Sequence, residues 1–136
     1  MSIEPKRTTA LTLAILQARM SSTRLPGKVM ADLVGAPMIL RQIERLKRAK
    51  TLDQIVVATS SDPSDNALAS ALAAEGIGVY RGSLDDVLGR FIGALDAFEG
   101  HDTVVRLTAD CPLADPDLID QTIALHLDQG GDYASN

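Results

Sequence analysis

The sequence predicts an α/β protein built on a mainly parallel sheet with helices on both faces. Short apolar runs alternate with longer amphipathic segments, and the connections between them are short. The first run, residues 11–16, is almost continuously apolar, as expected for a strand that is covered on both faces. Polar side chains gather where the predicted strands end, at the edge where parallel sheets bind ligands.

Four strands and four helices are expected in alternating order. The predicted strands are residues 11–16, 55–58, 78–80 and 103–108. The predicted helices are residues 37–50, 63–75, 84–99 and 116–129. Pro37 is expected at the first helical position, and Asp62 and Asp115 each precede a proline as capping acceptors. Glycine ends three of the helices, at Gly76, Gly100 and Gly130.

Two burial expectations follow from these elements. The helical period of residues 84–99 predicts a buried apolar face. Its members are Val87, Leu88, Phe91, Ile92 and Leu95. Arg106 is the one charge inside the predicted strand 103–108. A buried guanidinium needs partners, so Arg106 is expected to pair with a carboxylate rather than to bind a ligand.

Composition excludes several classes of function. The chain has 136 residues, enough for one domain, with 46% hydrophobic and 23% charged residues, as in ordinary soluble proteins. Aromatic residues make up 3% and tryptophan is absent, which disfavours platforms that stack nucleic-acid bases. Cys111 is the single cysteine, so no internal disulfide can form, and a cytoplasmic setting is expected. No apolar run reaches the length of a membrane span.

Charge is distributed unevenly along the chain. Residues 1–50 hold ten lysines and arginines and three acidic residues, whereas residues 51–136 hold three lysines and arginines and fifteen acidic residues. Half of the early cations fall between Arg41 and Lys50, where they suit the exposed face and last turn of a helix. We therefore do not expect nucleic-acid binding.

The loop from Leu16 to Lys28 is the strongest candidate for a binding site. Arg19, Arg24 and Lys28 fall within ten residues, between hydroxyl side chains and beside Pro26-Gly27, which predicts a turn. Cationic and amide donors after a buried strand are suited to a polyphosphate. The loop lacks the Walker spacing, since positions 22 and 29 hold serine and valine, and a surface loop with incidental cations is the alternative.

Two further places carry candidate chemistry. Asp110 follows the strand 103–108 and could hold Mg²⁺ against triphosphate oxygens, or could simply form a turn before Pro112. Asp86 and Arg90 lie four residues apart on one helix, so they could form a surface ion pair or could equally line the pocket.

Four stretches of the chain resemble the cytidylyltransferases that make CMP-activated acidic sugars, most closely their spore-coat polysaccharide branch. The matching blocks are residues 17–28, 81–91 and 106–113, together with 132–136. The resemblance implies a Rossmann-like nucleotide-diphospho-sugar transferase fold. It also implies that the cofactor is Mg²⁺, that the substrates are CTP and an acidic or modified sugar, and that pyrophosphate is released.

The resemblance also implies roles for individual residues. The expected catalytic residues are Arg19, Lys28 and Asp110, with Asp110 as the metal ligand. The expected nucleotide-binding residues are Leu16, Gln17, Ala18, Arg19, Ser22, Arg24, Lys28 and Arg81. The expected sugar-binding residues are Asp86, Arg90 and Asn136.

Family members are longer than this chain, so residues 1–136 are expected to be the nucleotide-binding portion of a nucleotidyltransferase domain that is incomplete at its C-terminus. The missing part would supply sugar contacts, a second metal carboxylate and a homodimer interface. A noncatalytic nucleotide-binding module and a glycosyltransferase that uses a nucleotide-sugar are the alternative functions.

Overall fold

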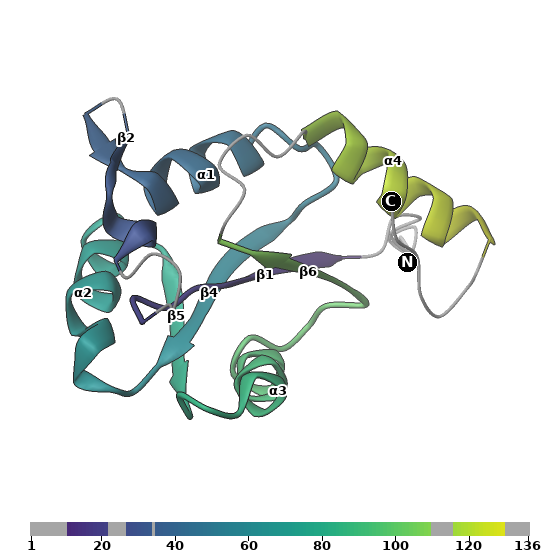
Figure 1. Cartoon of the computed structure of the whole chain (residues 1–136). Helices are drawn as coiled ribbons and strands as arrows, with labels where there is room; N and C mark the ends of the chain where they lie inside the picture. Colours follow the sequence, from purple (N-terminus) through teal and green to yellow (C-terminus); the bar gives the residue numbers. More distant parts are fainter. Residues whose placement is uncertain (1–10, 22–26, 34, 110–115, 130–136) are drawn as a thin grey trace, which may run out of the picture.

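The computed structural model describes residues 11–21, 27–33, 35–109 and 116–129, with the backbone alone for Lys28 and residues 126–129. A parallel four-stranded sheet in the order β5-β4-β1-β6 runs through the middle of the molecule (Figure 1). Its strands are β1 (Thr12–Gln17), β4 (Gln54–Ser60), β5 (Gly78–Gly82) and β6 (Thr103–Thr108). The main helices are α1 (Met38–Leu46), α2 (Asn66–Ala74), α3 (Val87–Ala97) and α4 (Pro116–Gln129). The predicted parallel α/β architecture is confirmed.

Strand β1 is the centre of the sheet. All six of its residues are buried, and it pairs in parallel with β4 on one side and β6 on the other. Leu16, for example, is in register with Val57 of β4 and Leu107 of β6. The nearly continuous apolar run in the sequence therefore reflects a strand that is covered on both faces and both edges.

Helices cover both faces of the sheet, as predicted. One core contains Leu16 and Val57 together with buried residues of α1 and α2, and Ile119 of α4 packs against it. The other core contains Leu13, Ile15 and Ala94, so α3 lies on the opposite face (Figure 1). The long crossover through α3 carries the chain from the β5 edge to β6, on the far side of β1.

The predicted buried face of α3 is partly wrong. Val87, Leu88 and Ile92 are 36%, 66% and 48% exposed, whereas Ala94 is fully buried and Phe91 is partly buried. The helix approaches the sheet through its small residues, since a Cβ at Gly93 would overlap the ring of Tyr80. This close approach rotates the larger apolar side chains outward.

Arg106 is exposed, so the expectation of a buried guanidinium is also wrong. It shares a sheet face with Ile15, its register partner, on the side that α3 covers. The main contacts of α3 are with β5, β4 and β1, which leaves the β6 end of that face open to solvent.

The start of α1 was also predicted incorrectly. Ala36–Pro37 forms β3, which pairs antiparallel with β2 (Asp32–Leu33), and the short 3-10 helix η1 (Lys28–Met30) precedes them. Pro37 is therefore the residue before the first helical position, and Met38 donates its amide to the carbonyl of Ala31 (2.8 Å). Two-residue strands are too short to leave a period in the sequence.

The predicted stop and start signals around α2 are confirmed. Asp62 caps the 3-10 helix η2 (Pro63–Asp65) by accepting from the Ser64 amide at 3.0 Å. Gly76 follows α2 with φ +72°, a conformation that favours glycine. Within the described ranges, no helix has both the length and the apolar character that crossing a membrane requires.

Asp120 of α4 fixes the connection between α1 and β4, and it should make the stability of the fold sensitive to acid. Its carboxylate accepts from the amides of Lys50 (2.9 Å) and Thr51 (3.0 Å) and from the Thr51 hydroxyl (2.5 Å). Burial raises the pKa of Asp120, but these hydrogen bonds outweigh burial and hold the pKa below its ordinary value of 3.8. The carboxylate therefore stabilises the fold above that value, and the contribution is lost as the pH falls through the lower folded-state pKa.

We expect Asp120→Ala to lower the free energy of unfolding by about 1–3 kcal/mol at neutral pH. The difference from the unmodified chain should shrink below about pH 4, where the carboxylate becomes protonated. Urea unfolding over a pH series measures both effects, with exposed Asp96→Ala on α3 as the control. A difference that stays constant from pH 7 to pH 2 would contradict this role of the charge.

Candidate functional site

The sheet has a topological switch point between β1 and β6, because β4 and β5 were added on one side of β1 and β6 on the other. Ligands of such sheets bind beyond the carboxyl ends of the strands at that point. Gln17 and Thr108 are the last residues of the two strands and are in register, and the Ala109 amide donates to the Gln17 carbonyl (2.9 Å). The loop predicted to bind phosphate leaves the sheet at this point.

Arg90 of α3 is the buried cation at this edge, with 3% of its surface exposed. Its Nη1 donates to the carbonyls of Ser83 (3.1 Å) and Leu84 (2.8 Å), and its Nη2 donates to Oε1 of Gln17 (3.3 Å). Its Nε is buried without a hydrogen-bond partner. Helix α3 thus places the Arg90 guanidinium against Gln17, the last residue of β1.

Arg19 follows Gln17, the side-chain partner of Arg90, by two residues, and its charge acts on Arg90. The pKa of Arg90 is lowered, first by burial and then by the charge of Arg19, while Asp65 and Asp86 act in the opposite direction. Arg19 itself is exposed at the start of the loop. The positive charges of the two arginines at this edge favour the binding of a negatively charged ligand.

Met20 holds both ends of the loop, because it forms hydrogen bonds with Asp65 and with Gly27. Its amide donates to Oδ1 of Asp65 (2.6 Å), and its carbonyl accepts from the amide of Gly27 (2.7 Å). Gly27 has φ +76°, as expected for the glycine of a turn, and its carbonyl accepts from the Met30 amide (3.0 Å). The start of the segment from Met20 to Gly27 is therefore bonded to Asp65, and its end is bonded back to Met20.

Arg81 lies inside β5 and not beyond its end, and it braces the neighbouring strand. Its Nε donates to the carbonyl of Ser60 (2.8 Å), and its Nη2 donates to the carbonyl of Asp62 (3.0 Å) and to Oδ1 of Asn66 (2.9 Å). These bonds give Arg81 a structural role at the carboxyl end of β4. Its predicted contact with nucleotide stays a prediction.

Comparison with known proteins assigns the family. A protein-family model described as cytidylyltransferase matches residues 13–136, nearly the whole chain. The chain belongs to the cytidylyltransferase family. The spore coat polysaccharide biosynthesis protein SpsF of Bacillus subtilis is 40% identical over 125 residues, which cover 89% of this chain and 52% of SpsF. The 3-deoxy-manno-octulosonate cytidylyltransferase of Geobacter sulfurreducens is 37% identical over 112 residues, which cover 82% of this chain and 43% of that enzyme.

Solved structures of cytidylyltransferases share the fold. One from Leptospira borgpetersenii matches with a TM-score of 0.83 and 34% identity, covering 90% of this chain and 51% of that one. A CMP:2-keto-3-deoxy-manno-octonic acid synthetase complexed with CTP matches with a TM-score of 0.76 and 25% identity, covering 90% and 49%. The chain spans about half the length of these relatives.

The structure describes part of the cytidylyltransferase site predicted from the sequence. It brings Arg90 into contact with Gln17 at the switch point, two residues before the exposed Arg19. Lys28 begins η1, but its side chain lies outside the described atoms. Four other predicted residues also lie outside the described ranges: Ser22, Arg24, Asp110 and Asn136.

The backbone of Leu16–Ala18, expected near the base of the nucleotide, is largely engaged in the sheet. The Gln17 carbonyl accepts from Ala109, and the Ala18 amide donates to the Ala58 carbonyl (3.0 Å). The Gln17 side chain is also occupied, since Oε1 accepts from Arg90 and Nε2 donates to the Val87 carbonyl (3.4 Å). These contacts hold the strand end rigid, and any contact with the base stays a prediction.

Asp86 and Arg90 do not form the surface ion pair that was one of the two predicted readings. The Asp86 carboxylate caps α3 by accepting from the Gly89 amide (2.8 Å), while the guanidinium of Arg90 is directed to the strand end. The other hypothesis, that these residues line the ligand site, stays a prediction.

Two buried residues of this edge were missed by the sequence analysis. Asp65 has no exposed surface, and Gln42 of α1 is 1% exposed and donates to the carbonyl of Thr108 (2.9 Å). Gln42 could have been found, since it lies four residues from both Met38 and Leu46 on the apolar stripe of its helix. Asp65 left no comparable signal in the sequence.

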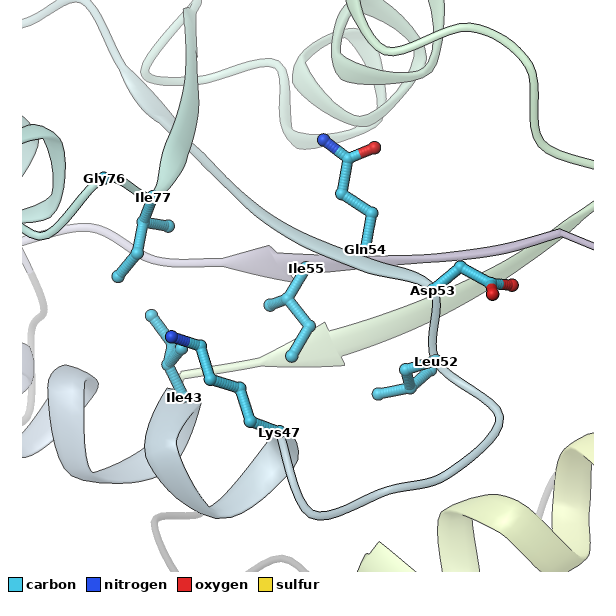
Figure 2. A pocket seen from close by; sticks show the side chains of 8 residues that line it. All are labelled: Ile43, Lys47, Leu52, Asp53, Gln54, Ile55, Gly76 and Ile77. Carbon is cyan, nitrogen blue, oxygen red and sulfur yellow. The ribbon is translucent and has the colours of Figure 1, made fainter.

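A cavity of about 210 Å³ lies away from this edge (Figure 2). Four apolar residues line it together with Lys47, Asp53, Gln54 and Gly76: Ile43, Leu52, Ile55 and Ile77. Gln54 begins β4 and Ile77 precedes β5, so the cavity opens at the amino ends of the strands. Parallel sheets bind their ligands at the other end, and the cavity is therefore not the nucleotide site.

Replacement of Arg90 tests whether this buried cation holds the site together. We expect Arg90→Met to lower the free energy of unfolding by about 2–4 kcal/mol, because it leaves one buried acceptor and two partly buried acceptors without their donor. Urea unfolding measures the loss. Arg48→Met is the matched control, because Arg48 is exposed near the end of α1 and should cost less than about 0.5 kcal/mol. Equal stability of the two variants would contradict the structural part of this role.

Proposed function

We propose that this chain is the nucleotide-binding portion of an enzyme that couples CTP to an acidic or modified sugar, for surface polysaccharide, and releases pyrophosphate. The observation that carries the proposal is the buried guanidinium of Arg90 on Gln17 at the switch point, where the exposed Arg19 begins an anchored loop. Two relatives support the nucleotide and the sugar, since one is a 3-deoxy-manno-octulosonate cytidylyltransferase and the other is a synthetase whose structure is complexed with CTP. SpsF supports the polysaccharide role.

In the proposed reaction, an oxygen of a sugar hydroxyl attacks the α-phosphorus of CTP. The new bond joins the sugar oxygen to the α-phosphorus, the hydroxyl proton passes to solvent, and the bond from the α-phosphorus to the oxygen bridging the α- and β-phosphates breaks, so that pyrophosphate leaves. The residues of this chain contribute positive charge and placement. Arg19 and Lys28 would contact the phosphates, and the fixed guanidinium of Arg90 would add positive potential without reorganisation during the reaction. Ser22, Arg24 and Arg81 are further proposed nucleotide contacts, and Asp86, Arg90 and Asn136 proposed sugar contacts.

Mg²⁺ is the proposed cofactor, and Asp110 would hold it. Within the described ranges, no three potential metal ligands cluster together. Mg²⁺ is usually bound by one or two carboxylates and by substrate phosphates, so a single carboxylate beside the triphosphate is a suitable ligand. The backbone is fixed up to Ala109, because Gln42 donates to the Thr108 carbonyl and the Ala109 amide donates to the Gln17 carbonyl. Asp110 therefore directly follows an anchored backbone. When bound, the ion would neutralise charge on the phosphates.

Calorimetric titration of the chain with CTP and CMP, in the presence of Mg²⁺, tests the nucleotide part of the proposal. We expect CTP to bind at least tenfold more tightly than CMP, because the cations act on the β- and γ-phosphates. Arg19→Ala should reduce that preference, whereas exposed Arg48→Ala should leave it unchanged. Equal affinity for the two nucleotides would rule out a triphosphate site.

Release of pyrophosphate in the presence of a panel of acidic sugars separates an enzyme from a nucleotide-binding module. The test needs the chain both alone and joined to the second half that its relatives possess. Activity in the longer protein but not in this chain would assign catalysis to both halves together. Binding of CTP without pyrophosphate release from either protein would favour the noncatalytic module. A homodimer and a cytoplasmic location stay predictions.

A further inference from the structure

Asp65 is a carboxylate with no exposed surface, at the end of η2 and the start of α2. A buried carboxylate is costly unless hydrogen bonds compensate for the lost water. Its Oδ1 accepts from the Met20 amide (2.6 Å), and its Oδ2 accepts from the Ser60 hydroxyl. One carboxylate thus joins the loop after β1 to the end of β4, across 45 residues of sequence.

The support under Asp65 is rigid. The Ser60 hydroxyl also accepts from the Asp62 amide (3.2 Å), and the Asp65 amide donates to the Asp62 carbonyl (2.9 Å). Arg81 binds the carbonyls of both Ser60 and Asp62 from the neighbouring strand. The position of the carboxylate is therefore set by β4, β5 and η2, and not by the loop that it holds.

The consequence for the loop concerns Arg19. On one side of Arg19, the Ala18 amide is bound to the Ala58 carbonyl (3.0 Å); on the other side, the Met20 amide is bound to Asp65. The backbone of Arg19 is thus held between two anchors, one from the sheet and one from a side chain. Since Gly27 returns to the carbonyl of Met20, the same anchor also fixes the far end of the loop.

We propose that Asp65 is a positioning residue for triphosphate binding, which acts by anchoring Met20 and so fixing where Arg19 meets the phosphates. This inference rests on the proposed function and deepens it. Asp65 does not contact the nucleotide itself. Its negative charge is turned inward to an amide and a hydroxyl, and the cationic side chain next to the anchor faces solvent.

The test compares Asp65→Ala, which removes both acceptors, with Asp65→Asn, which retains an acceptor for Met20. We expect Asp65→Ala to weaken CTP binding by tenfold or more and CMP binding by less than threefold. Asp65→Asn should remain within about threefold of the unmodified chain for both nucleotides. Asp62→Ala is the matched control, because Asp62 caps the same 3-10 helix without touching the loop.

A double-mutant cycle separates positioning from a general loss of stability. If Asp65 acts through Arg19, then Arg19→Ala should weaken CTP binding much less in the Asp65→Ala background than in the unmodified chain. Additive losses would overturn the proposal. The proposal is also overturned if Asp65→Ala loses affinity for CTP and CMP equally. A loss of CTP affinity in Asp65→Asn as large as that in Asp65→Ala would overturn it as well.

Hydrogen exchange gives a readout that does not depend on the nucleotide. The Met20 amide should exchange at least tenfold faster in Asp65→Ala than in the unmodified chain, while the Ala18 amide should be unchanged. Unchanged exchange at Met20 would overturn the anchor even if CTP binds. Failure of the unmodified chain to bind CTP, together with faster exchange at Met20, would instead reject the proposed function and retain the anchor. If Asp65→Ala does not fold, Ser60→Ala gives the same exchange test with a smaller expected increase.

Discussion

The complete burial of β1 between two strands and two layers of helices is the constraint on which the rest of the structure depends. With β4 and β6 on its edges and a core on each face, the strand has no freedom to shift. Its last residue, Gln17, is therefore a fixed point from which the loop begins. Two further hydrogen bonds extend this rigid region by one residue. The Ala18 amide donates to the Ala58 carbonyl, and the Ala109 amide donates to the Gln17 carbonyl.

The electrostatics of the site follow from this rigidity. In a chain with net charge −5, Arg90 is buried against Gln17, two residues before Arg19, whose charge lowers the pKa of Arg90. Burial of a guanidinium is unfavourable in isolation, and it persists because three hydrogen bonds fix Arg90 to Gln17, Ser83 and Leu84. Preorganised positive charge of this kind is what a transferring phosphate requires, since the protein need not rearrange as charge develops.

Most of the fold, but only part of the candidate site, could be predicted from the sequence. The four main strands and the parallel order were predictable because apolar runs and capping residues are local signals, as Asp62 and Gly76 show. The β2–β3 pair was missed, since two residues leave no period. The outward rotation of Leu88 and Ile92 was missed because it depends on how closely Gly93 lets α3 approach Tyr80.

The sequence by itself determined the alternation of strands and helices, the cationic loop after β1 and the turn at Gly27, because each depends on residues close together in the chain. Only the tertiary structure decided that Arg90 is buried and Arg106 exposed, because burial depends on which element covers a face and how far it extends. The same holds for Asp65, whose partner Met20 lies 45 residues away. No local pattern reports a hydrogen bond that is formed only when β1 and β4 lie side by side.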